Sequence, residues 1–265
     1  MQLFYRLKLN KSSQIFHHHH SAAFTFGVLP LFLGTVVDYY ALYNQKACLS
    51  ISSRAATYLF SSFPFTGLCF CVFFALYSNF EKATETHCCI RNVLPSISVA
   101  TGDFYLGHLI WRILIFTHLI PRVVAAFAYA QLFRIPLKSV VQSTFRYLTC
   151  FFNILELFCL AIVSAISSRD NHFRHVIAFS IFQIAGIIHG ALHIVMYRVT
   201  LKKTCYKWSV LFLIICGLLY YRHNSRCEPY VFSAFAFFEY LVVLTNICFH
   251  ATFRFDFYGL RIFVF

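Results

Sequence analysis

Three polar residues interrupt the apolar stretch nearest the C-terminus, and their spacing places them on one helix face. The stretch 229–251 contains Glu239, Asn246 and His250. At 100° per residue, Asn246 lies about −20° and His250 about +20° from Glu239 around a helix. A carboxyl group in lipid is costly unless it is paired, neutral or hydrated. This polar line is therefore expected to face the protein interior.

Other apolar stretches also carry polar residues three or four positions apart: His118 with Arg122, Asn153 with Glu156, and His189 with His193. A histidine or carboxylate can accept the proton of a hydroxyl that attacks an acyl carbonyl, and Asn, Tyr or Arg can stabilise the oxyanion. The same side chains can instead join helices, as an Arg122–Glu156 ion pair would. Two histidines alone do not make a metal site, so no metal is predicted.

The composition indicates an all-α polytopic membrane protein with a six-helix transmembrane bundle. Of 265 residues, 60% are hydrophobic and 12% are charged, about half the charged fraction of a soluble domain. The predicted domains are an N-terminal extension (1–53), a six-span membrane domain (54–256) and a short cytosolic tail (257–265). The predicted spans, each near the length of about 20 residues that crosses a bilayer, are 56–79, 107–132, 145–167, 175–199, 208–221 and 229–251.

Basic residues flank these spans and predict their orientation. The net charge of +13 would suggest nucleic acid in a soluble protein, but here the bases are of the kind that holds helix ends at an anionic leaflet, so no nucleic-acid partner is expected. One set of connections carries Arg54, Arg134, Lys138, Arg146, Arg198, Lys202, Lys203, Lys207, Arg254 and Arg261. The other carries only Lys82, Arg91, Arg169, Arg174, Arg222 and Arg226. The richer set is expected to be cytosolic, so the loops 80–106, 168–174 and 222–228 are predicted to be luminal.

Three cysteines, Cys88, Cys89 and Cys227, fall in predicted luminal loops. Because the secretory lumen is oxidising, a disulfide from Cys88 or Cys89 to Cys227 is expected, with three free thiols as the alternative.

The third luminal loop also carries Arg222, Asn224 and Arg226. Arginine binds phosphate through two parallel hydrogen bonds, so these residues are predicted to contact a lipid headgroup. Ordinary anchoring at the membrane interface is the alternative.

Several motifs resemble a known family. They are Thr86-His87-Cys88 with the segment 92–98, Arg222-His223-Asn224 with Cys227-Glu228, and the segment 238–246 with Phe249-His250. The sequence is similar to the post-GPI-attachment-to-proteins factor 2 family, within the wider FRAG/DRAM/Sfk group of six-span membrane proteins. The resemblance covers about Arg54 to Asp256, and residues 1–53 lie outside it.

This resemblance implies a multi-pass protein of the Golgi membrane, or also of the endoplasmic reticulum, that acts on the lipid of GPI-anchored proteins. The family is required for reacylation of the lyso-GPI intermediate with a saturated chain. The implied partners are that lipid moiety, membrane lipids and other remodelling enzymes. No cofactor is expected beyond an acyl donor, which could be acyl-CoA or a phospholipid.

Because the GPI glycan is luminal, the favoured catalytic candidates are the luminal-side residues Glu239, His223 and His87. The remaining polar residues are assigned to an intramembrane network: His118, Arg122, Asn153, Glu156, His189, Asn246 and His250. A non-enzymatic regulator or scaffold that binds lipid or an acyltransferase is the main alternative. A seven-span receptor would require residues 21–43 to cross the membrane as well, and its short loops carry no receptor motif.

Overall fold

The computed structural model describes residues 3–6, 23–26, 49–132, 140–196, 200–257 and 261–264. The chain divides into two units, Leu59–Thr252 and a second unit made of Met1–Tyr58 and Phe253–Phe265. The candidate additional span 21–43 lies outside the described residues except for one four-residue strand. The extension 1–53 and the tail 257–265 are likewise described only in part.

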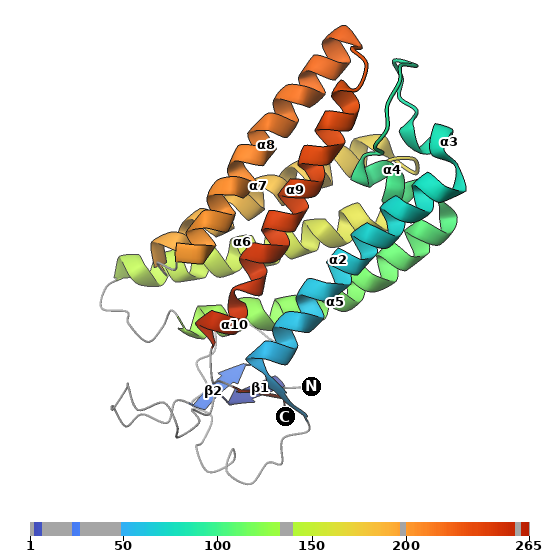
Figure 1. The fold of residues 1–265 in the computed structure, drawn as a ribbon. Coiled ribbons are helices and arrows are strands. Elements are labelled where there is room, and N and C mark those ends of the chain that lie inside the picture. Colours follow the sequence, from blue (N-terminus) through green and yellow to red (C-terminus); the bar gives the residue numbers. More distant parts are fainter. Residues whose placement is uncertain are drawn as a thin grey trace. The chain divides into compact units, whose positions relative to one another are not determined.

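Long helices make up most of the chain (Figure 1). Their bounds are α2 Ser53–Ser78, α3 Phe80–Thr84, α4 Ile97–Gly102, α5 Tyr105–Leu132, α6 Val140–Ala165, α7 His172–Met196, α8 Thr200–Arg226, α9 Val231–Ala251 and α10 Phe253–Asp256. Four short strands belong to the second unit: β1 Leu3–Arg6 pairs with β2 Ala23–Phe26, and β3 Leu49–Ser52 pairs with β4 Arg261–Val264, both antiparallel.

The prediction of an all-α bundle with six membrane-crossing helices is confirmed. Six helices among the described residues are long and apolar enough to span a bilayer, namely Thr57–Ser78, Tyr105–Ala130, Val140–Ala165, His172–Met196, Thr200–Arg226 and Val231–Asp256. The fifth differs most from its predicted range of 208–221. Its helix extends through basic residues at both ends, which hydropathy alone had excluded from the span.

The helices pack as antiparallel neighbours joined by short connections. α5 packs against α6, α6 against α7, and α8 against α9, and Figure 1 shows α8 and α9 side by side. The helices α2 to α5 share a buried cluster that includes Leu68, Ala83, Ala100 and Trp111. This cluster fixes the segment between α2 and α5 to the bundle.

A disulfide between Cys88 and Cys227 joins two connections that are 139 residues apart in sequence. The connection after α6 meets the same region, because the His175 ring contacts Ser98 Oγ through Nε2 at 3.1 Å and the Ile166 carbonyl through Nδ1 at 2.7 Å. The end of the bundle formed by residues 79–104, 166–171 and 227–230 is called the disulfide end below.

Side-chain hydrogen bonds define the turn between α6 and α7. Arg112 of α5 donates to the carbonyls of Ser164 and Ala165, which are among the last of α6 and have no partner within the helix. Asn171 caps α7 by accepting the Arg174 N–H at 3.0 Å. Within the turn, hydrogen bonds from the side chain and backbone of Ser167 lower the pKa of Asp170.

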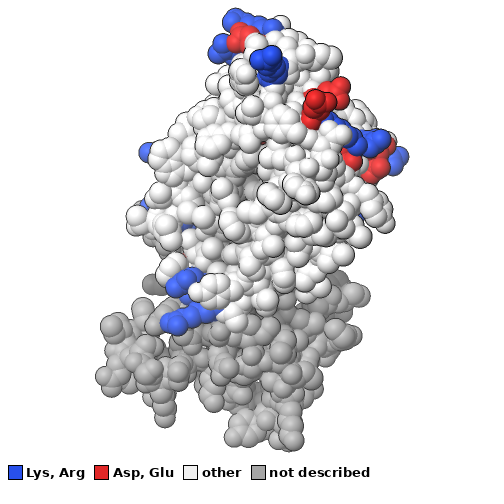
Figure 2. All heavy atoms as spheres, turned by 45° about the vertical axis from the view of Figure 1, so that its right-hand side comes forward, with Lys and Arg blue, Asp and Glu red and all other residues white. Residues whose placement is uncertain are grey.

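The outer surface of the bundle is apolar. Large hydrophobic side chains such as Phe73, Ile120, Phe158, Ile214 and Leu218 are more than half exposed. Figure 2 shows one face of the molecule. Most charged side chains of the described residues gather in groups toward its two ends, and a broad, largely uncharged band lies between them. Such a band is what a lipid bilayer covers.

Gly190 marks a close approach between α7 and α8 and yields a test of the packing. A Cβ at this position would lie 2.7 Å from Cδ2 and 2.9 Å from Cε2 of the Tyr206 ring. The variant Gly190→Ala is therefore expected to lose about 1–3 kcal/mol of stability through overpacking, measured by thermal unfolding in detergent. The control is Gly217→Ala on α8, where nothing lies within 4 Å of the added atom. Equal stability of the two variants would contradict the packing described here.

Candidate functional site

A cavity of about 120 Å³ lies inside the bundle and is lined by polar and apolar side chains. Ser98 and His175 line it at the disulfide end, and so does Glu239 of α9, which contacts the backbone of Ile97 beside Ser98. Glu156, His189 and His250 also line it, from three different helices. The cavity therefore connects the disulfide end with the polar interior of the membrane-spanning helices.

Glu156 of α6 is the centre of the polar interior. Its side chain is 1% exposed, and its partners come from three other helices. Arg122 of α5 lies 3.3 Å from Oε1, and Asn246 of α9 donates to the same oxygen at 3.5 Å. The ring Nδ1 of His189 on α7 lies 3.0 Å from Oε2. Nε2 of His250 on α9 lies 3.4 Å from Oε1.

A second buried polar group lies beside this cluster. Nζ of Lys202, which is 1% exposed, donates to Tyr129 Oη at 2.9 Å and lies 2.8 Å from His193 Nε2. The ring centroids of His193 and His189 are 5.8 Å apart. The lysine was read from the sequence only as a flanking charge. Lys202 shares a helix face with Cys205, which is also buried, and with Ser209, which lines the cavity. This spacing is a sequence signal for its burial. The neighbouring Lys203 and Lys207 make the signal hard to recognise.

Glu239 has a different set of contacts from Asn246 and His250, although all three line the cavity. Its Oε2 accepts the backbone N–H of Ile97 at 2.8 Å. Ser233, six residues before Glu239 on α9, accepts the N–H of Val93 at 2.8 Å. Tyr240 donates to the Pro95 carbonyl. We call these three α9 side chains, Ser233, Glu239 and Tyr240, the α9 latch. Glu239 thus both lines the cavity and holds the backbone of the segment before α4.

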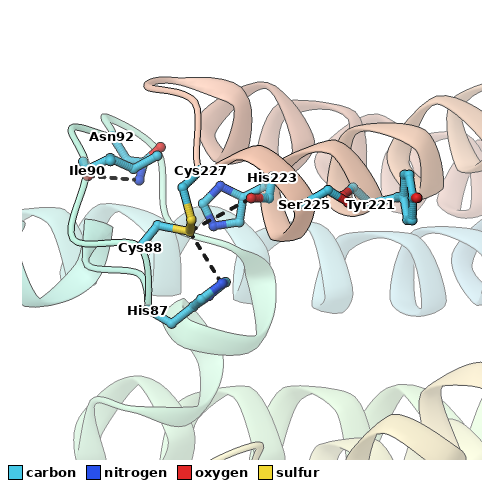
Figure 3. The surroundings of a disulfide bond; sticks show 8 residues. All are labelled: His87, Cys88, Ile90, Asn92, Tyr221, His223, Ser225 and Cys227. Carbon is cyan, nitrogen blue, oxygen red and sulfur yellow. Dashed lines mark hydrogen bonds between the residues drawn. A yellow bond between two sulfur atoms is a disulfide. The ribbon is translucent and has the colours of Figure 1, made fainter.

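His87 and His223 lie beside the disulfide (Figure 3). Neither is among the residues that line the cavity. His223 is 0% exposed, and its ring centroid lies 5.2 Å from that of His87 and 4.9 Å from that of Phe232. His87 Nε2 lies 3.3 Å from Cys88 Sγ. The three favoured catalytic candidates are therefore split, with Glu239 on the cavity and the two histidines packed around the Cys88–Cys227 bond.

The predicted headgroup-binding residues lie at the exposed end of α8. Arg222 forms an ion pair with Glu228, and Arg226 Nη1 lies 3.7 Å from the same carboxylate. Hydrogen bonding to Arg222 lowers the pKa of Glu228, so this pairing persists above the lowered pKa and is lost as the pH falls through it. Asn224 is exposed beside them. One acidic group thus partly balances two cations, which keeps a net positive surface here.

The remaining predicted network residues divide by position. His118 is buried on α5 and lines the cavity together with Arg122. Asn153 is buried on α6, one turn before Glu156, and is not among the cavity-lining residues. The structure therefore brings Arg122, Glu156, His189, Asn246 and His250 into one cluster, with His118 beside it on the cavity wall.

Within the described part of the chain, two groups of side chains have the ligand types of a metal site. The ligand atoms of Glu156, His189 and His250 lie within 4.8 Å of one another, and two histidines with a carboxylate are a known zinc set. The Arg122 guanidinium beside Glu156 opposes a dication there. In the other group, His87 with Cys88 and Cys227, both sulfur atoms are already joined in the disulfide.

Comparison with known proteins identifies relatives over most of the chain. Residues 52–260 match the family model "Frag1/DRAM/Sfk1/Cwh43P N-terminal domain". A Caenorhabditis elegans protein named "Post-GPI attachment to proteins factor 2" is 36% identical over 239 residues, covering 83% of this chain and 91% of that protein. A Drosophila melanogaster protein of the same name is 33% identical, covering 76% and 84%. A Xenopus tropicalis protein named "Acyltransferase PGAP2" is 32% identical, covering 74% and 84%. No solved structure matches the chain.

Proposed function

The chain belongs to the Frag1/DRAM/Sfk1/Cwh43p family, and from this premise we propose that it remodels the lipid of GPI-anchored proteins. The proposed step is reacylation of the lyso-GPI intermediate with a saturated chain. Two kinds of relative support it, because their names refer to post-GPI attachment and to acyl transfer. The structural observation that carries the proposal is the cavity, which brings histidine, carboxylate and arginine side chains together inside a membrane-spanning bundle. These are the groups that acyl transfer between lipids needs.

The proposed location is the Golgi membrane, with the disulfide end in the lumen. The distribution of Lys and Arg favours this orientation, and a disulfide at that end fits an oxidising compartment. In this orientation Arg222 and Arg226 face the leaflet that contains the phosphoinositol of a GPI anchor. They are proposed to contact its phosphate, in competition with Glu228.

Deletion of the gene in the native organism tests the biological role. Lyso-GPI is expected to accumulate and GPI-anchored proteins to be lost from the cell surface, because the missing chain weakens membrane anchoring. Lipid mass spectrometry of purified GPI-anchored proteins measures the first effect, and surface labelling measures the second. Re-expression of the intact chain is the control. Normal GPI lipids after deletion would refute the proposed role.

A non-enzymatic role is the second candidate, and the hydrogen bonding of the buried acids favours it. The Glu156 carboxylate contacts four side chains on three helices, and Glu239 accepts a backbone N–H. A purely structural role, in which these groups hold helices together, is sufficient to explain such contacts. Purified protein that binds lyso-GPI, or a partner acyltransferase, and transfers no acyl chain would support a scaffold. The acyl donors to supply are acyl-CoA and a phospholipid.

A further inference from the structure

His189 and Glu156 form a pair on the cavity wall, joined as the histidine and the carboxylate of a catalytic triad are joined. The imidazole Nδ1 lies 3.0 Å from Glu156 Oε2, and both side chains are almost fully buried. Arg122 lies on the other oxygen of the same carboxylate at 3.3 Å. A carboxylate with a buried cation beside it stays ionised and accepts hydrogen bonds, so the Nδ1 of His189 is the nitrogen that carries the hydrogen.

This arrangement leaves Nε2 of His189 as the basic nitrogen. In a neutral imidazole one nitrogen donates and the other accepts. No residue that the structure describes forms a hydrogen bond with His189 Nε2, and the side chain lines the cavity. His250 is placed differently, because it presents Nε2 to Glu156. A carboxylate that holds one imidazole nitrogen fixes the tautomer and orientation of the other, as in serine hydrolases.

We propose that His189 is the general base of acyl transfer in this cavity and that Glu156 is its positioning residue. This inference rests on the proposed function and moves the reacting centre from the disulfide end into the membrane interior. The acceptor is a lipid hydroxyl, and the donor is an acyl thioester or acyl ester. Arg122 lines the same cavity and has further N–H donors of the kind that stabilises an oxyanion.

The reaction balances with these groups. His189 Nε2 takes the proton of the acceptor hydroxyl. At the same time the hydroxyl oxygen forms a bond to the acyl carbonyl carbon, which gives a tetrahedral oxyanion. Collapse of that intermediate breaks the bond from the carbonyl carbon to the leaving sulfur or oxygen. The proton on Nε2 then passes to the leaving group, which departs as a thiol or an alcohol. The products are the acylated lipid and neutral His189.

The depth of His189 favours a thioester donor. It lies 17 residues after the start of α7 and seven before its end, or about 25 Å from the disulfide end and about 10 Å from the opposite end along the helix. In the proposed orientation, His189 lies nearer to the cytosolic end of α7, the side on which acyl-CoA is found. The acceptor hydroxyl reaches His189 from the disulfide end through the cavity, which extends from Ser98 and His175 to His189. Because this hydroxyl and the phosphate are on neighbouring glycerol carbons, the phosphate must first leave Arg222 and Arg226.

The decisive variant is His189→Asn in purified protein reconstituted into vesicles with lyso-GPI and palmitoyl-CoA. The asparagine amide can replace Nδ1–H as a donor to Glu156, and it removes Nε2. Initial transfer rates are expected to fall by about 10²–10⁴-fold, the usual contribution of a general base. The same substitution at the exposed His172 of α7, outside the cavity, is the matched control and keeps the rate. Thermal unfolding and an intact Cys88–Cys227 bond show that each variant is folded.

Glu156→Gln tests the positioning role separately. The rate constant kcat is expected to fall with little change in KM, and Glu156→Asp is expected to recover part of it. If wild-type protein transfers acyl chains and His189→Asn stays within tenfold of it, the assignment of His189 is overturned and the proposed function stands. If wild-type protein transfers no chain from palmitoyl-CoA or from a phospholipid, this inference falls together with the enzymatic role.

Discussion

Replacement of Arg122 by methionine is expected to lower the free energy of unfolding by about 3–5 kcal/mol, the cost of removing one partner from a buried ion pair. Glu156 is 1% exposed and Arg122 is 3% exposed, so bulk solvent does not reach the carboxylate to replace the lost cation. The variant leaves the Glu156 carboxylate inside the bundle without its guanidinium partner. Thermal unfolding of the detergent-solubilised protein, followed by circular dichroism, measures the loss.

The double variant Arg122→Met with Glu156→Gln separates charge from shape. Removing both charges deletes the uncompensated carboxylate, so most of the stability lost in Arg122→Met is expected to return. Glu156→Gln alone strands the guanidinium and is expected to be less stable than the double variant. Additive losses in the double variant would mean that the two side chains are not coupled. The double variant is thus expected to fold with neither the Arg122 nor the Glu156 charge in the cluster.

The second large effect is expected from Cys88→Ser. The disulfide spans 139 residues, and loss of a native bridge typically costs about 2–4 kcal/mol through the freedom regained by the unfolded chain. Thermal unfolding with and without a reducing agent measures it. Reduction is expected to bring wild-type protein to the stability of the variant and to leave the variant unchanged.

Cys89→Ser is the matched control for this experiment. Cys89 is the adjacent cysteine, is exposed, and carries a free thiol in the structure. Its substitution makes the same chemical change without opening the bridge. A destabilisation by Cys89→Ser as large as that of Cys88→Ser would indicate that the two cysteines exchange as partners of Cys227. That was the choice that the sequence left open.

Hydropathy predicts the parts of the bundle that face lipid. It does not predict which charged residues are buried between helices, and for this reason the predicted range of α8 was too short. It located all six spans but shortened α8, because the basic residues Lys202, Lys203 and Lys207 end the apolar run. In the structure the helix begins at Thr200, and Lys202 is buried against Tyr129 and His193. The local sequence gives only a weak sign of this burial, the helix repeat Lys202, Cys205 and Ser209, and it does not identify the partners on other helices.

Helical spacing predicts which residues share a face and does not predict their partners on other helices. The line Glu239, Asn246 and His250 lies along the cavity, yet Glu239 contacts Ile97 whereas the other two contact Glu156. An Arg122–Glu156 pair could be suggested from charge alone, and it is present. To predict the contact of His189 with the same carboxylate, one must know how α6 and α7 are rotated relative to each other. This rotation cannot be derived from a single sequence.

The α9 latch has a consequence for how the protein can change over evolution. Besides the Asn92 side chain, to which Ser233 donates, its partners include three main-chain groups: the N–H of Val93 and of Ile97, and the carbonyl of Pro95. Every residue type offers a carbonyl, and every type except proline offers an N–H. These three contacts therefore do not depend on the side chains of Val93, Pro95 and Ile97. Other contacts still constrain the segment, because Pro95 and Ser96 are buried and Ser96 caps α4. The side-chain half of each contact belongs to Ser233, Glu239 or Tyr240, so a substitution at one of these three residues is expected to remove the contact.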